Sequence, residues 1–147
     1  MIASFQWLLS ARQKVQAKLI AAMSGGERST IAYVWEYWTR EEQLPPSGDW
    51  RIWMVMAGRG FGKTRASAAW VRMTAERQPG ARIALVSASL AEARAVMVKG
   101  ESGLLAIYPP HERPVFEPSL QRVRFANGSQ AQLLLGGRAR DPARSAA

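Results

Sequence analysis

The chain has 147 residues, of which 48% are hydrophobic and 21% charged, a composition typical of one globular domain with a buried core. Its formal net charge of +9, from 16 Arg and 4 Lys against 11 acidic residues, suits a polyanionic partner, although GC-rich coding produces the same arginine bias. There is no cysteine and His111 is the single histidine. Disulfide scaffolds and thiolate chemistry are therefore excluded, and a zinc site or a Ser-His-Asp triad nearly so.

Residues 1–28 are predicted to form an N-terminal amphipathic arm. Basic and apolar residues alternate there at helical spacing up to Ser24-Gly25-Gly26, where the helix is expected to end. The apolar run at the start is short and has no basic stretch before it, so we expect neither a membrane span nor an export signal.

Residues 29–135 are predicted to form an α/β domain. A helix is expected over 29–43 with Ser29 or Thr30 as N-cap, followed by a proline-rich turn. The apolar run Trp50–Met56 precedes glycines and predicts a strand buried on both faces of a parallel sheet. Three further elements are predicted: a helix over 63–78 with Ala66, Ala69, Trp70 and Met73 inward, a buried strand over 82–87 and a helix over 90–99. Together with the first strand they follow the βαβ order of a parallel sheet.

A β-hairpin is predicted near the C-terminus. Its strands are expected over 121–125 and 130–135, with Asn127-Gly128 in a tight primed turn that needs positive φ angles. The segment before it, 100–114, is expected to be a loop, and the tail 136–147 is Gly/Arg/Ala-rich and receives no structure.

The sharpest motif is the glycine loop, residues 57–64. It reads Ala-Gly-Arg-Gly-Phe-Gly-Lys-Thr and matches the phosphate-binding pattern G-x-x-x-x-G-K-[ST] except at its first position, Ala57. Glycines let several backbone N–H groups face a polyphosphate at the start of a helix. The side chain of Lys63 would supply charge to the β- and γ-phosphates, and the Thr64 hydroxyl would bind Mg²⁺. The predicted nucleotide-binding residues of the loop are Gly58, Arg59, Gly60, Phe61, Gly62, Lys63 and Thr64.

Carboxylates for hydrolysis are not evident in the sequence. A P-loop ATPase needs an acid at the end of a later apolar strand, usually beside a second one. The two aspartates, Asp49 and Asp141, follow no such strand, and Glu112 and Glu117 lie near prolines. We therefore expect ATP and Mg²⁺ binding with little hydrolysis.

Over about residues 30–135 the sequence resembles the large terminase subunit of tailed bacteriophages and gene transfer agents, an ATP-driven motor that packages double-stranded DNA. The resemblance rests on these segments: Trp35-Glu-Tyr-Trp38, Gln43-Leu-Pro-Pro46, Gly48-Asp-Trp50, the glycine loop, the strand 82–87, Val96-Met-Val, Gly100-Glu-Ser-Gly-Leu104, Glu117-Pro-Ser and the hairpin. It implies a RecA/ASCE-like P-loop NTPase fold, a parallel sheet with flanking helices, here incomplete.

The resemblance also implies roles for residues and partners. Gln43 corresponds to an adenine-reading glutamine, with a helix C-cap as the alternative, and Arg59 to an arginine that reaches the γ-phosphate. The Ser87–Ser89 turn would sense phosphate or DNA, whereas Trp35 and Trp38 are better explained by packing. The implied partners are double-stranded DNA, a portal and a small terminase subunit, in the host bacterial cytoplasm, with full-length relatives assembling as rings.

The tail departs from the family pattern. Relatives continue with Pro-Glu-x-Leu-Arg-Gly-Pro-Gln, then the Walker B carboxylates and a nuclease domain. Codons for residues 139–147 can be chosen so that the next frame restores that segment, and a frameshift is a hypothesis that the gene sequence decides. Two alternatives stay open: a small P-loop kinase or nucleotide-transfer enzyme, and a non-catalytic prophage remnant or DNA-binding fragment.

Overall fold

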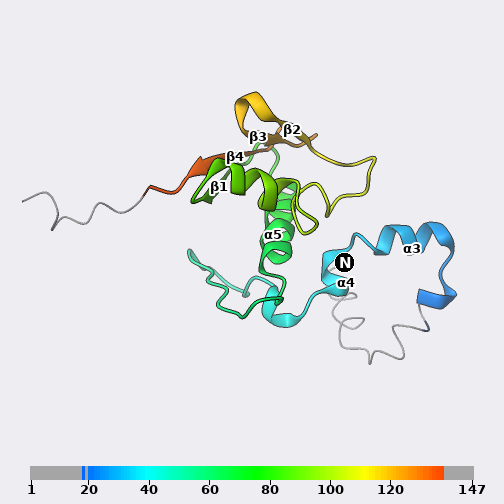
Figure 1. The fold of residues 1–147 in the computed structure, drawn as a ribbon. Helices are drawn as coiled ribbons and strands as arrows, with labels where there is room; N and C mark the ends of the chain where they lie inside the picture. Colours follow the sequence, from blue (N-terminus) through cyan, green and yellow to red (C-terminus); the bar gives the residue numbers. More distant parts are fainter. Residues whose placement is uncertain (1–17, 19, 138–147) are drawn as a thin grey trace, which may run out of the picture.

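A computed structural model describes residues 18 and 20–137 and shows a four-stranded mixed sheet with helices (Figure 1). The strands are β1 (Arg82–Ser87), β2 (Val115–Glu117), β3 (Arg122–Arg124) and β4 (Gln130–Leu135), in the order β1-β4-β3-β2. β1 pairs with β4 in parallel, whereas the other two pairs are antiparallel. The α/β class is thus confirmed, and parallel pairing is confined to one pair. The predicted arm and tail lie largely outside the described residues.

The central helix matches its sequence prediction closely. The helices are α3 (Gly25–Ile31), α4 (Trp35–Trp38), η1 (Glu41–Gln43), α5 (Lys63–Arg77), α6 (Leu90–Glu92), which continues as the π-helical η2 (Ala93–Val98), and η3 (Pro118–Leu120). The predicted helices 63–78 and 90–99 and the predicted strand 82–87 are therefore confirmed. Over the described range, no helix combines the length and apolarity needed to cross a bilayer.

The single helix expected over 29–43 is wrong, because three short helices replace it. α3 begins at Gly25, where the preceding helix was expected to end, so Ser29 and Thr30 lie inside a helix. Ser24 and Glu27 explain this start: the Glu27 N–H donates to Ser24 Oγ (3.3 Å) and the Ser24 N–H donates to Glu27 Oε2 (2.8 Å). This reciprocal pair is a capping box.

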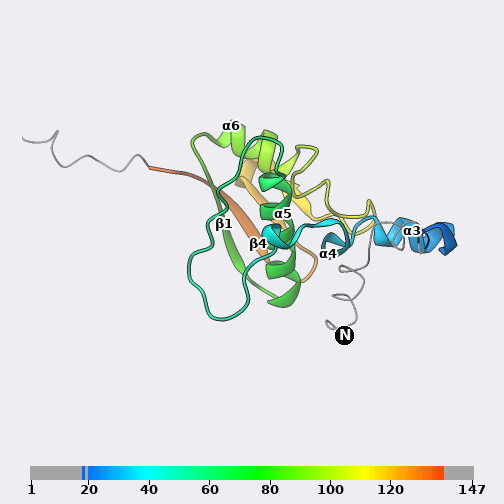
Figure 2. The same cartoon turned by 90° about the horizontal axis from the view of Figure 1, so that it is seen from below.

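The segment that leads into the glycine loop, residues 50–56, is not a strand, contrary to the sequence prediction. Ile52, Met54 and Met56 are 81%, 71% and 86% exposed. Figure 2 shows this part of the chain as a long loop beside β1. A cavity of about 600 Å³ is lined both by the segment and by Val86 of β1. An apolar run forms a strand only when a neighbour takes its backbone hydrogen bonds. In the described range β1 pairs with β4 alone, so the segment lies beside β1 without joining the sheet.

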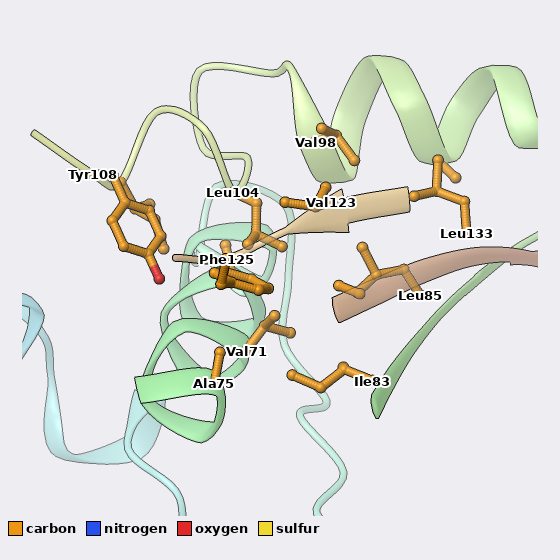
Figure 3. Packing of buried hydrophobic residues seen from close by; sticks show 14 residues of the cluster. Val71, Ala75, Ile83, Leu85, Val98, Leu104, Tyr108, Val123, Phe125 and Leu133 are labelled. Atoms are coloured by element: carbon orange, nitrogen blue, oxygen red, sulfur yellow. The ribbon is translucent and has the colours of Figure 1, made fainter. Parts of the chain in front are cut away.

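The hydrophobic core lies on one face of the sheet, under α5 and η2 (Figure 3). Alternate residues of β1 and β4 point into it, and α5 adds one row of small and branched side chains. The members that carry this packing are Ala68, Val71, Ala75, Ile83, Leu85, Val98, Ala131 and Leu133. The opposite face is open, since the register partners Val86 and Leu134 are 52% and 44% exposed. The strand over 82–87 is therefore buried on one face only.

The inward face of α5 agrees with the predicted one in part. Ala66 and Ala69 are buried as expected, and Trp70 is partly buried and packs against the core cluster. The two alanines lie outside that cluster, which receives Ala68, Val71 and Ala75. Apolar residues surround most of this helix, so their spacing does not single out one face.

The hairpin is confirmed, with a different turn from the one expected. The Phe125 N–H donates to the Ser129 carbonyl (2.9 Å) across a three-residue loop, and within it only Gly128 has a positive φ, +85°. The Asn127 side chain donates through Nδ2 to the Ala75 carbonyl (2.7 Å) near the end of α5. Asn127 therefore fixes the turn to the helix and does not adopt the left-handed backbone of a primed turn.

The Gly100–Leu104 segment closes the end of η2. The Leu104 N–H donates to the Met97 carbonyl (2.8 Å), which satisfies one of the acceptors left open where the helix stops. A Cβ at Gly103 would lie 2.8 Å from the Val98 carbonyl oxygen, so only glycine fits. This Gly-Glu-Ser-Gly sequence accordingly has a packing role in the fold.

Candidate nucleotide-binding site

The glycine loop joins the 50–56 segment to the N-terminus of α5. Gly60 and Gly62 have φ angles of +80° and +91°, which glycine adopts without strain. Gly62 is the N-cap of α5, a helix of 15 residues. The first N–H groups of such a helix lack intrahelical acceptors, and they concentrate partial positive charge where the loop ends. Loop and helix end together suit an anion such as phosphate.

Lys63, the first residue of α5, folds back onto the loop. Its Nζ donates to the carbonyl oxygens of Ala57 (2.7 Å) and Gly58 (2.9 Å). The ammonium group is therefore held against the loop backbone, where phosphate oxygens would compete with these carbonyls for its protons. Arg59 is exposed in the middle of the same loop.

Gln43 contacts the loop from outside. Its Nε2 donates to the Phe61 carbonyl (2.6 Å), while its Oε1 accepts from the Arg40 N–H (3.0 Å). The residue is 7% exposed, and a Cβ added at Gly62 would lie 2.8 Å from its Nε2. The Arg40 guanidinium also lies 5.8 Å from the centroid of the Phe61 ring. The structure thus brings Gln43 together with the loop, through contacts to Phe61 and Gly62.

A cavity of about 220 Å³ lies beside the start of α5. Lys63, Thr64 and Ser67 of α5 line it together with Ser87 from the end of β1 and Glu92 from α6, and apolar side chains form the rest. The Ser87 hydroxyl donates to Glu92 Oε2 (3.0 Å). Sequence reasoning missed Glu92, although Ser89-x-x-Glu92 directly after a strand is a recognisable helix start.

No family model, curated protein or solved structure matches the chain. The functional assignment therefore depends on the loop, on the residues that contact it and on the resemblance seen in the sequence.

The donor set at the cavity fits a magnesium ion that arrives with a nucleotide. Among the residues that the structure describes, no three His, Cys, Asp or Glu side chains gather as a ready-made ligand set. Mg²⁺ commonly keeps several waters and takes its other ligands from phosphates and one or two protein oxygens. The Thr64 hydroxyl is a hard oxygen donor of that kind, and the Glu92 carboxylate lines the same cavity, where it can accept hydrogen bonds from such waters.

Trp38, one of the two tryptophans of the resemblance, makes contacts inside the fold. The Trp38 ring meets Tyr37 edge to face, with centroids 5.0 Å apart, and its Nε1 donates to the Ile31 carbonyl (2.8 Å). Tyr37 is the buried member of this pair, while Trp38 is 52% exposed. These two contacts hold the Trp38 ring against Tyr37 and the end of α3, as the packing explanation expects.

Proposed function

We propose that the glycine loop and the N-terminus of α5 bind the phosphates of ATP as its Mg²⁺ complex. The observation that carries this proposal is the position of Lys63, whose Nζ lies 2.7 Å from the Ala57 carbonyl oxygen, within a loop bent at two glycines. The Lys63 charge binds the β- and γ-phosphates, and the Thr64 hydroxyl binds the metal ion. The ion, when bound, neutralises the phosphates.

We further propose that this chain is the ATP-binding portion of a phage-type large terminase subunit. The support is the sequence resemblance, together with the structural roles of two of its segments: Gln43 contacts the loop, and Gly100–Leu104 closes η2. In this proposal the motor acts on double-stranded DNA with a portal and a small subunit, and Arg59 reaches the γ-phosphate.

Nucleotide binding is tested by calorimetric titration of the chain with ATP and Mg²⁺. Lys63→Ala should weaken binding roughly 10–100-fold, since it removes charge-assisted hydrogen bonds. Lys99→Ala is the matched control, because its ammonium lies over the Phe116 ring, 5.8 Å from the centroid, and takes no part in the loop. Equal affinities for the chain and for Lys63→Ala would overturn the proposal.

Two further measurements test the narrower claims. Turnover of ATP should be slow, and fast turnover that depends on Lys63 would contradict the expectation that the chain carries no hydrolytic carboxylate pair. Binding to duplex DNA should fall steeply as salt rises, because neutralised phosphates release counterions. Absence of DNA binding at low salt would favour the remnant interpretation over the packaging one.

A further inference from the structure

Glu92 lies outside the glycine loop motif, but it lines the same cavity as Lys63 and Thr64. It follows β1 by five residues and occupies the first turn of α6. Of the side chains that line this cavity, Glu92 carries the one carboxylate and Lys63 the one ammonium group. A charged acid next to a phosphate site needs an explanation, because like charges repel at short range.

The hydrogen bonds of Glu92 differ from those of an ordinary helix cap. Its N–H donates to Ser89 Oγ (3.1 Å), as in a capping box. In that motif the glutamate side chain returns to the backbone N–H of the cap residue, whereas here Oε2 accepts from the Ser87 hydroxyl (3.0 Å). The carboxylate is thus fixed to the carboxyl end of β1, at the wall of the cavity.

We propose that Glu92, positioned by Ser87, binds the hydration shell of the Mg²⁺ carried by the nucleotide and so couples metal and nucleotide binding. The inference rests on the proposed nucleotide site. Without the metal, the Glu92 charge opposes the triphosphate. With the metal between them, the same charge stabilises the complex, so one residue acts in opposite directions in the two conditions.

The test is nucleotide affinity measured with and without the metal. A non-hydrolysable ATP analogue is titrated into the full chain in excess Mg²⁺ and again in EDTA. The gain in affinity that Mg²⁺ gives should fall roughly tenfold in Glu92→Gln. Tenfold is the low end of the losses typically seen when a residue that contacts the metal's ligands is replaced. In EDTA the same variant should bind the analogue more tightly than the unmodified chain.

Ser87→Ala and Glu101→Gln complete the design. Ser87→Ala should shift the Mg²⁺ effect in the same direction by a smaller factor, and it tests the inference independently if Glu92→Gln folds poorly. Glu101→Gln removes an exposed acid from the turn after η2 and should leave the Mg²⁺ effect unchanged. An unchanged effect in both cavity variants, with normal nucleotide binding, overturns the inference alone. Absence of nucleotide binding by the unmodified chain overturns the proposed function and the inference with it.

Discussion

The side-chain amide of Gln43 donates to the carbonyl oxygen of Phe61 at 2.6 Å and joins η1 to the glycine loop across 18 residues of sequence. The other end of the same amide accepts from Arg40 and Thr39, at 3.0 and 3.2 Å. With 7% of the residue exposed, these contacts use most of its hydrogen-bonding capacity. Gln43 therefore supports the shape of the loop.

Gln43→Ala should weaken binding of ATP, GTP and inorganic tripolyphosphate by similar factors. The variant removes a bond to the loop that all three ligands share, and a lost neutral hydrogen bond corresponds to about 1 kcal/mol, or roughly fivefold. Competition titrations measure the three affinities. Gln132→Ala serves as control, because that amide donates to the Leu120 and Gln121 carbonyls away from the loop. A loss confined to ATP would instead establish adenine reading by Gln43.

Gly62→Ala should destabilise the fold more than Gly80→Ala. Both glycines have left-handed φ angles, +91° and +78°, so each substitution costs about 1–2 kcal/mol in the backbone. Only at Gly62 does the new Cβ also meet a neighbour, Gln43 Nε2 at 2.8 Å, whereas Gly80 has open space. Urea unfolding measures the difference in the free energy of unfolding.

The comparison has a built-in check. In a Gln43→Ala background the excess cost of Gly62→Ala should disappear, because the clashing amide is gone. An excess that persists would place the strain elsewhere in the loop.

Ser129→Ala should lower the free energy of unfolding by about 1–3 kcal/mol, the cost of leaving buried polar groups without a partner. Ser129 is 0% exposed, and its Oγ lies 3.2 Å from the Ala75 oxygen and 3.0 Å from the Gln78 oxygen. Ser119→Ala, at an exposed position of η3, should change stability by no more than about 0.5 kcal/mol. Thermal or urea unfolding of both variants checks the expectation, which fails if the two behave alike.

Glu117 should stabilise the fold in a pH-dependent way. Arg122 and Arg124 donate hydrogen bonds to its carboxylate, and these bonds lower the pKa of Glu117. The folded pKa thus lies below the unfolded value of about 4.3. The stabilisation is fully present above that unfolded value and is lost as the pH falls through the folded pKa.

The measurement is the unfolding free energy of the chain and of Glu117→Gln as a function of pH. The variant should be less stable near neutral pH, and the gap should close in acid. The substitution Glu112→Gln provides a comparison, because Glu112 is an acidic residue that does not pair with Arg122 or Arg124. A gap that stays constant down to pH 2 would rule out ionisation of Glu117 as its cause.

Local signals in the sequence predict the parts of the fold that depend on nearby residues. α5 follows a Gly-Lys-Thr start and stops before Pro79-Gly80, so its ends are fixed within the segment. The 50–56 segment was predicted wrongly because a strand needs a partner, and hydrophobicity alone does not supply one. The turn at Asn127 was predicted with the wrong geometry, since its side chain is used by a contact 52 residues away.

The candidate site likewise contains residues that local sequence predicts and residues that only the fold brings to it. The roles of Lys63 and Thr64 could be predicted from the sequence, because their spacing after the glycines is that of a phosphate-binding loop. The place of Glu92 could not be predicted from the sequence. It depends on the direction in which α6 leaves β1 and on the hydrogen bond from the Ser87 hydroxyl. Gln43 was found, but its contact to Phe61 follows only from the fold.

β1 has a neighbouring strand on one side only within the described part of the chain. Its outer amide and carbonyl groups form a template that another polypeptide can extend, and the exposed Ile52 and Met56 lie on the segment that shares a cavity with it. Copies of the chain that associate along this edge would contact segment 50–56, which leads into the glycine loop. Self-association and nucleotide affinity should therefore be thermodynamically linked, and the apparent dissociation constant for ATP should depend on the protein concentration at which it is measured.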